Sequence, residues 1–316
     1  MSDTEEEIST QYIPFSQRAE WSDVVPIKQD DGPHPICKIA YTPQFSETMD
    51  FFRAILRQDE RTPRALELTK EVIDLNPANY TAWYFRRLVM DALKDSYDLH
   101  DEIKFVSKVG SKHPKNYQIW YHRKVIVEKL GDFSQELQYT QQQIEEDSKN
   151  YHAWAHRQWV VETTGSWEAE ITYIESLLKD DSRNNSAWNQ RFFVVTKNRT
   201  QTLTPQLREQ EIEFAFTYTR KSPNNQSPWS YLRGLFTYSQ SQDNSALKDL
   251  CLNFRQKYVT CPHVVVILID VLEQEKTSDS YKQAIEYCDE LANSLDTIHS
   301  KYWKHKKETL LAASGL

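Results

Sequence analysis

Five side chains in two short stretches could together bind an anion. An ammonium group, two phenols, an amide and an imidazole come from Lys115, Tyr117, Gln118, Tyr151 and His152. These residues flank Asn116 and Asn150, and asparagine is a preferred residue at the start of a helix. The first turn of a helix has unsatisfied N–H groups and partial positive charge, which suit a phosphate or a carboxylate. The plainer interpretation, that Lys115 is a solvated loop lysine, stays open at this point.

The histidines do not indicate a metal site in this chain. His152 and His156 stand four apart, as two zinc ligands on a helix can, but Ala153 occupies the place where a metalloprotease needs its glutamate. His122 and His156 each follow a Trp by two residues, which favours a repeated packing or hydrogen-bonding role. His152 has no such counterpart in the other repeats, so it is the better candidate for chemistry. No Gly-rich phosphate loop, nucleophile elbow or pair of carboxylates indicates a self-sufficient catalyst.

The elements that carry these residues are repeats. An asparagine is followed four residues later by a tryptophan, and in four of five copies an arginine follows three residues after that. The repeated residues are Asn79, Trp83, Arg86; Asn116, Trp120, Arg123; Asn150, Trp154, Arg157; Asn184, Trp188, Arg191; and Asn225, Trp229. Successive tryptophans are 37, 34, 34 and 41 residues apart, a period typical of helix-pair solenoids.

A second marker shows that each repeat is a unit of two helices. Eighteen residues before each Trp stands Ala65, Glu102, Glu136, Glu170 or Glu211, followed by an apolar, any, apolar triplet. Because this distance is constant, the additional residues of the 37-residue and 41-residue spacings must lie in the connections between repeats. The asparagine should cap the second helix. Each Trp can stack with the Arg of its own motif as a cation–π pair. The favoured interpretation of both residues is packing between repeats, in which the Arg forms an ion pair with the neighbouring acidic helix.

Composition supports an all-α fold. The 316 residues include only 6 Gly and 12 Pro, too few for many tight turns. We expect a right-handed α-α superhelix, that is, a tetratricopeptide-like solenoid of antiparallel helical hairpins, over residues 46–316. Residues 1–45 should be an acidic mobile start followed by an extended, Pro-containing arm. The apolar residues of that arm predict that it lies against a surface, either its own or a partner's.

Charge and cysteine usage narrow the classes of partner. The net charge is −8, which disfavours nucleic acid and anionic membranes. No stretch approaches the roughly 20 apolar residues of a membrane span, and the acidic start lacks the plan of a signal peptide. We therefore expect a cytoplasmic protein. Its four scattered cysteines should be reduced and mostly buried.

The motif resembles the repeats of a known family. Asn79-Tyr-Thr-Ala-Trp-Tyr-Phe-Arg86, Lys115-Asn-Tyr-Gln-Ile-Trp-Tyr-His-Arg123 and Asn150-Tyr-His-Ala-Trp-Ala-His-Arg157 are similar to repeats of protein prenyltransferase α subunits. Arg18-Ala-Glu-Trp-Ser-Asp23 and Phe52-Arg-Ala-Ile-Leu-Arg57 resemble the arm and first helix of the α subunit that farnesyltransferase and geranylgeranyltransferase type I share. The resemblance covers nearly the whole chain.

The resemblance implies a heterodimer with a β subunit, which transfers farnesyl or geranylgeranyl from the prenyl diphosphate to the cysteine of a C-terminal CaaX box. Zinc belongs to the β subunit and activates the thiol, and magnesium accompanies the diphosphate. Lys115 would face the diphosphate, Tyr151 and His152 would line its pocket, and Gln118 would hydrogen-bond the terminal carboxylate of the substrate. Tyr117 would pack beside the reacting groups.

Two other interpretations have to be weighed. The 34-residue period alone would also suit a non-catalytic tetratricopeptide-like scaffold that binds acidic peptide tails, but such repeats do not demand Asn, Tyr, Trp and Arg at these intervals. The α subunit of a Rab-type geranylgeranyltransferase is a third possibility, which further domains or variant motifs would favour.

Overall fold

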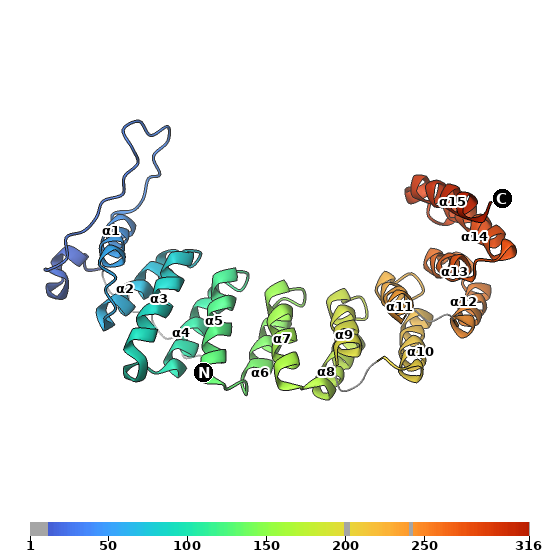
Figure 1. Ribbon diagram of the computed structural model, residues 1–316, viewed down its shortest axis with the longest axis horizontal. Helices are drawn as coiled ribbons and strands as arrows, with labels where there is room; N and C mark the ends of the chain where they lie inside the picture. Colours follow the sequence, from blue (N-terminus) through green and yellow to red (C-terminus); the bar gives the residue numbers. More distant parts are fainter. Residues whose placement is uncertain (1–11, 199–202, 240–242, 316) are drawn as a thin grey trace, which may run out of the picture. The chain divides into compact units, whose positions relative to one another are not determined.

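The computed structural model describes residues 12–198, 203–239 and 243–315, and its described residues form helices and connections without a strand. The expected mobile acidic start lies outside the described residues. The predicted all-α class is confirmed, and the helices follow one another as antiparallel hairpins (Figure 1). No described helix has the length and apolar character needed to cross a membrane.

The chain divides into two compact units. The first comprises Met1–Tyr139 and Asn150–His156, and the second comprises Thr140–Lys149 and Arg157–Leu316. The first unit holds α1 (Pro43–Gln58), α2 (Pro63–Leu75), α3 (Tyr80–Leu93), α4 (Leu99–Lys112) and α5 (Tyr117–Leu130). Both units share α6 (Glu136–Glu146) and α7 (Tyr151–Thr164). Helix α1 begins three residues before Ser46, where helical periodicity becomes visible in the sequence, because Thr42 caps it and Pro43 suits its first position.

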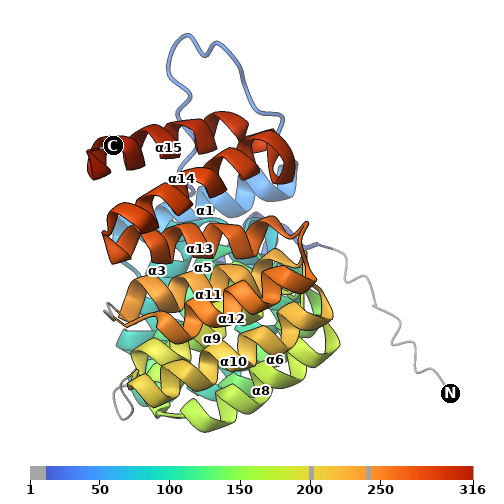
Figure 2. The same cartoon turned by 90° about the vertical axis from the view of Figure 1, so that its right-hand side faces the viewer.

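The second unit continues the hairpins. It contains α8 (Trp167–Asp180), α9 (Asn185–Lys197), α10 (Pro205–Lys221), α11 (Gln226–Ser239), α12 (Ser245–Lys257), α13 (Pro262–Glu275), α14 (Ser278–Glu290) and α15 (Ser300–Ser314). Figure 2 shows α13, α14 and α15 packed one after another, where the sequence motif has faded but helices are still expected. A π-helical turn, Leu291–Leu295, joins α14 to the connection before α15.

The recurrent asparagines start the second helices, as predicted. The Oδ1 atom of Asn116 accepts hydrogen bonds from the backbone N–H groups of Gln118 at 2.9 Å and Ile119 at 3.3 Å. Corresponding caps are made by Asn79, Asn150, Asn184 and Asn225. The first helical residue of α3, α5 and α7 is therefore a tyrosine, whose exposed ring extends outward at the capped end of the helix.

The recurrent arginines and glutamates are buried ion pairs between successive repeats. Arg86 pairs with Glu102 and Arg123 with Glu136 in the first unit, while Arg157 pairs with Glu170 and Arg191 with Glu211 in the second. Each glutamate also receives a hydrogen bond from the residue two positions after the Trp of its own repeat. These donors are His122, His156, Gln190 and Tyr231. Two partners for each buried carboxylate offset the cost of removing it from water.

The recurrent arginines form the favoured ion pairs, but Arg86, Arg123 and Arg191 stack on rings other than the Trp of their own motifs. The guanidinium of Arg123 lies 3.5 Å from the ring centroid of Tyr139, and that of Arg191 lies 3.6 Å from that of Phe214. Arg86 and Arg157 lie over Phe105 and Tyr173 in the same way. Each ring is the last residue of an apolar triplet and stands three residues after the glutamate that pairs with the same arginine. The salt bridge to this glutamate therefore brings the guanidinium over the ring. The core holds the side chains of Trp83, Trp120, Trp188 and Trp229, and each donates its Nε1–H to the carbonyl six residues earlier.

Candidate functional site

The turn before α5 is held in place by the next repeat, and this turn carries Lys115. The carbonyl oxygen of Pro114 accepts a hydrogen bond from Trp120 Nε1 at 2.8 Å and another from Asn150 Nδ2 at 3.1 Å. The side chain of His152 also hydrogen-bonds to the backbone of Lys115. Residues from both α5 and α7 therefore fix the backbone at Lys115, whose side chain is exposed. The structure brings Lys115 and His152 together, as the sequence predicts.

Three aromatic residues surround the imidazole of His152. Its ring centroid lies 4.2 Å from that of Tyr117 and 5.5 Å from that of Tyr151, both in edge-to-face orientation. The indole of Trp120 lies nearly parallel to it at 6.4 Å. Partial burial lowers the pKa of His152, and the hydrogen bond to the Lys115 backbone opposes this only in part. The imidazole is therefore neutral at pH 7, with one N–H committed to the backbone.

Tyr117 and Gln118 also border a groove between α3 and α5. The groove has a volume of about 480 Å³, and Tyr80, Tyr84 and Arg87 line its other side. Sequence reasoning missed these three residues as members of the site. For the tyrosines the signal was present, because Tyr80 and Tyr84 occupy the repeat positions of Tyr117 and Tyr121. Arg87 adds a second basic group to the five residues that were predicted.

Chemically, this surface suits an anion. The capped amino-terminal ends of α5 and α7 lie next to each other, and each contributes partial positive charge. Lys115 adds a full charge there, and the phenols of Tyr117 and Tyr151 can donate hydrogen bonds. Tyr117 and Tyr151 are 67% and 68% exposed, so the surface is open to solvent. An ammonium group in such a setting binds an anion weakly until something excludes water.

Beyond the five marked repeats, the second unit holds a structural counterpart of His152. His263, the second residue of α13, stacks on Trp229 at 6.5 Å and hydrogen-bonds to the backbone of Asn224, the residue before the recurrent Asn225. This is the same arrangement that His152 makes with Trp120 and Lys115. The hydrogen bond from this histidine to the backbone before the recurrent asparagine is thus a structural feature that occurs in more than one hairpin. What distinguishes His152 is its neighbours, namely Lys115 and the two exposed tyrosines.

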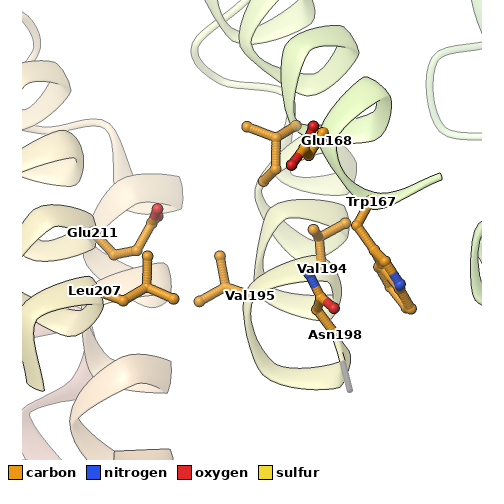
Figure 3. A pocket seen from close by; sticks show the side chains of 8 residues that line it. Trp167, Glu168, Val194, Val195, Asn198, Leu207 and Glu211 are labelled. Atoms are coloured by element: carbon orange, nitrogen blue, oxygen red, sulfur yellow. The ribbon is translucent and has the colours of Figure 1, made fainter. Parts of the chain in front are cut away.

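A further cavity lies among α8, α9 and α10 and has a different character. Its volume is about 260 Å³. Figure 3 shows Val194, Val195 and Leu207 among the side chains that line it. The carboxylate of Glu211 at its edge is already paired with Arg191 at 2.6 Å. Among the described residues that line this cavity there is no basic side chain, so it does not resemble an anion site. No described group of three or more His, Cys, Asp or Glu side chains could hold a metal ion.

Known proteins share both the repeats and the fold. The profile of the protein prenyltransferase alpha subunit repeat matches residues 62–93, 99–130, 133–164, 167–198 and 208–239. A protein farnesyltransferase/geranylgeranyltransferase type-1 subunit alpha from Dictyostelium discoideum is 45% identical over 316 residues, covering 98% of both chains. The protein of that name from Solanum lycopersicum is 44% identical and covers 95% of this chain and 92% of its own.

A solved structure is similar to the described fold. It is the Candida albicans protein geranylgeranyltransferase-I complexed with GGPP, in which a chain matches with a TM-score of 0.82 at 24% identity. The match covers 95% of this chain and 99% of that chain. With the repeat profile and relatives aligned over nearly their full length, the family is established. This chain belongs to the protein prenyltransferase α subunit family.

Proposed function

We propose that this chain is the α subunit of a heterodimeric enzyme that transfers a farnesyl or geranylgeranyl group to the cysteine of a CaaX box. In this reaction the thiolate sulfur forms a bond to the first prenyl carbon, the bond between that carbon and the diphosphate oxygen breaks, and the diphosphate leaves. The observation that carries the proposal is the grouping of Lys115, Tyr151 and His152 at two adjacent helix starts, in a chain of this family.

Each site residue has a role that its position supports. Lys115 faces the diphosphate and stabilises the negative charge that builds up as the bond breaks. Tyr151 and the neutral His152 line the same diphosphate pocket, where His152 also fixes the backbone of Lys115. Gln118 hydrogen-bonds the terminal carboxylate of the CaaX substrate within the groove that Arg87 borders. Tyr117 packs between these two regions because it borders the groove and contacts His152.

The exposure of the site supports the requirement for a second subunit. Transition-state charge is stabilised strongly only where donors are held in place and water is excluded. Here the backbone at Lys115 and the imidazole of His152 are held in place, but the side chains of Lys115, Tyr117 and Tyr151 are exposed. A β subunit that covers this surface would complete the site. Zinc belongs to that β subunit in our proposal, and magnesium comes with the diphosphate.

The competing functions are less well supported. A peptide-binding scaffold would not need the Lys115 cluster, and the repeats match the prenyltransferase profile. A Rab-type α subunit is disfavoured because the relatives that align over nearly the full chain bear the farnesyltransferase/geranylgeranyltransferase type-1 name. We also propose that the enzyme acts in the cytoplasm, where its free thiols at Cys251, Cys261 and Cys288 remain reduced.

Reconstitution tests this function. The chain alone should have no transferase activity, and co-expression with a farnesyltransferase β subunit should give zinc-dependent transfer of farnesyl to a CaaX peptide. A tetratricopeptide-like scaffold would bind the peptide without turnover in either case. A stable lone chain with full activity would contradict the proposal.

A further inference from the structure

The arm before α1 is divided between two environments. Residues 12–28 are fixed to α1 and α2 of the same chain. Glu47 accepts hydrogen bonds from the Tyr12 hydroxyl at 2.8 Å and from the backbone N–H of Phe15 at 3.0 Å. Arg18 pairs with Glu71, Arg64 with Asp23 and Lys28 with Asp50. Phe15, Trp21 and Val24 are buried in the core of the first unit. This part of the arm therefore lies on its own chain.

Residues 29–41, which we call the strap, behave differently. Their described hydrogen bonds all stay within the strap, as in the bond from the backbone N–H of Tyr41 to the Ile39 carbonyl at 3.0 Å. The side chains of Ile36 and Ile39 are fully and 69% exposed, and Cys37 and Ala40 between and beside them are exposed too. In Figure 1 the strap extends beyond α1 as a loop without helix or strand.

Both ends of the strap are fixed to α1. At one end, Ile27 and Asp50 are joined through the backbone at 3.0 Å, and Arg53 bonds the Ile27 carbonyl at 2.8 Å. At the other end, Thr42 caps α1 and the ring of Tyr41 stacks on Phe45 at 4.7 Å. A stretch that was only a solvated connection would not need two exposed isoleucines. Ile36, Cys37, Ile39 and Ala40 bring four exposed, largely apolar side chains together in one short segment, and such a segment can be bound in a groove of another protein.

We propose that the strap binds in an apolar groove on the β subunit, where Ile36 and Ile39 become buried. This inference rests on the proposed function, because it assumes the same heterodimer. The first unit that carries the strap also exposes five tyrosines in the first two turns of α3, α5 and α7, namely Tyr80, Tyr84, Tyr117, Tyr121 and Tyr151. The substrate site among them has to be covered by the β subunit. One partner then accounts for both exposed regions.

Proteolysis tests the position of the strap directly, because Lys38 is an exposed trypsin site between the two isoleucines. Cleavage after Lys38 should be fast in the isolated chain and at least about tenfold slower in the heterodimer, because a protease must unfold and bind the segment to cut it. Serum albumin at equal concentration replaces the β subunit in the control. Equal rates of cleavage at Lys38 in the free chain and in an active heterodimer would overturn the strap proposal and leave the proposed function intact.

A double variant, Ile36→Ser/Ile39→Ser, tests the contribution to binding. Loss of two buried isoleucines should weaken the heterodimer by about tenfold or more, measured as the dissociation constant or as the rate of exchange with tagged wild-type chain. The urea midpoint of the isolated chain should not change. The control Val259→Ser removes a 62% exposed apolar side chain from the α12–α13 connection and should leave the affinity unchanged.

The remaining outcomes contradict the proposal in distinguishable ways. Protection of Lys38 by self-association of the isolated chain, seen as a dimer in sedimentation, would assign the strap to a second copy. Protection by phosphatidylcholine vesicles but not by the β subunit would assign it to a membrane. Failure of the wild-type chain to form any complex with the β subunit would overturn both this inference and the proposed function.

Discussion

The imidazole of His152 stands edge-on to the ring of Tyr117, with the two planes at 88° and the centroids 4.2 Å apart. The two residues begin different helices, so this contact joins the start of α7 to the start of α5. The same imidazole hydrogen-bonds to the Lys115 backbone. His152 thus ties together the residues that we propose face the diphosphate, and its removal should disturb all of them at once.

For His152→Ala we expect the rate of prenyl transfer to fall by about tenfold to a hundredfold, because Lys115 loses one of the bonds that position it. His263→Ala is the matched control, since His263 makes the same stack and backbone bond near Asn224, away from Lys115 in sequence. It should change the rate by less than about twofold. Single-turnover kinetics of the heterodimer measure both. Equal losses in the two variants would show that His152 has a structural role only.

For Lys115→Ala we expect the chemical step to slow by about a hundredfold with little loss of affinity for the prenyl diphosphate. A contact that strengthens as charge develops acts on the transition state more than on the bound substrate. Lys149→Ala provides the control, because Lys149 precedes Asn150 as Lys115 precedes Asn116. The measurements are single-turnover rates and prenyl diphosphate binding. An unchanged rate would remove Lys115 from the mechanism.

Replacing Gln118 by Ala should raise KM for the CaaX peptide by about tenfold and leave the affinity for prenyl diphosphate unchanged. The reason is the loss of one hydrogen bond to a charged carboxylate, which is worth about 1.5–3 kcal/mol. Ser186→Ala changes the corresponding second residue of α9 and should have no such effect. Steady-state kinetics with the peptide acid and the peptide amide provide a second check. The variant should discriminate less between the two peptides than the wild type does.

The ladder of buried ion pairs predicts a large effect on stability. Arg123→Leu leaves the Glu136 carboxylate, 2% exposed, without its guanidinium partner, and should lower the free energy of unfolding by about 3–5 kcal/mol. Arg220→Leu breaks an exposed pair with Glu213 and should cost less than about 1 kcal/mol. Urea unfolding measures both. The double variant Arg123→Leu/Glu136→Leu should recover part of the loss, because no unpaired buried charge remains.

Stability should also fall in mild acid. Burial lowers the pKa of His122, although its hydrogen bond to Glu102 opposes the shift. Below the ordinary pKa of about 6.5 the unfolded chain binds a proton that the folded chain excludes, so stability declines as pH drops from 6.5 towards the lower folded value. The decline is at most about 1.4 kcal/mol per pH unit for this group.

The variant His122→Gln tests whether the loss of stability in mild acid comes from protonation of His122. Repeat four already uses Gln190 as the donor to its glutamate, at 2.7 Å, so the substitution keeps a donor that does not titrate. The free energy of unfolding, measured with urea at pH 7.5 and 5.5, should therefore differ less for the variant than for the wild type.

Glu102 is not expected to contribute to the pH dependence between pH 5.5 and 7.5. Burial would raise its pKa, but hydrogen bonds from His122 and Arg86 outweigh this and hold the pKa below its ordinary value. Its stabilisation is present at higher pH and is lost only as pH falls through that low folded pKa.

Much of the fold and the core of the site were predictable from the repeat. The caps at Asn116 and Asn150 depend on residues two or three positions away, and the tyrosines follow them directly. The sequence placed Glu136 at a marker position and predicted an ion pair from Arg123 to a neighbouring acidic helix, and the structure pairs these two residues. The stacking partner of Arg123 was not predictable in the same way. Tyr139 lies on the next helix, and only the packing of α5 against the following repeat places that ring under the guanidinium.

By itself, the sequence determined the number and phase of the marked helical hairpins, the capped helix starts and the cluster of groups around Asn116 and Asn150. Periodicity and capping are local properties, which are set within one or two helical turns. Only the tertiary structure decided that His152 anchors Lys115, that His263 repeats this device, and that the arm is bound to its own chain up to Lys28 and exposed beyond it. These outcomes depend on which side chains of separate segments meet, and contacts between residues more than twenty positions apart arise only when the chain packs.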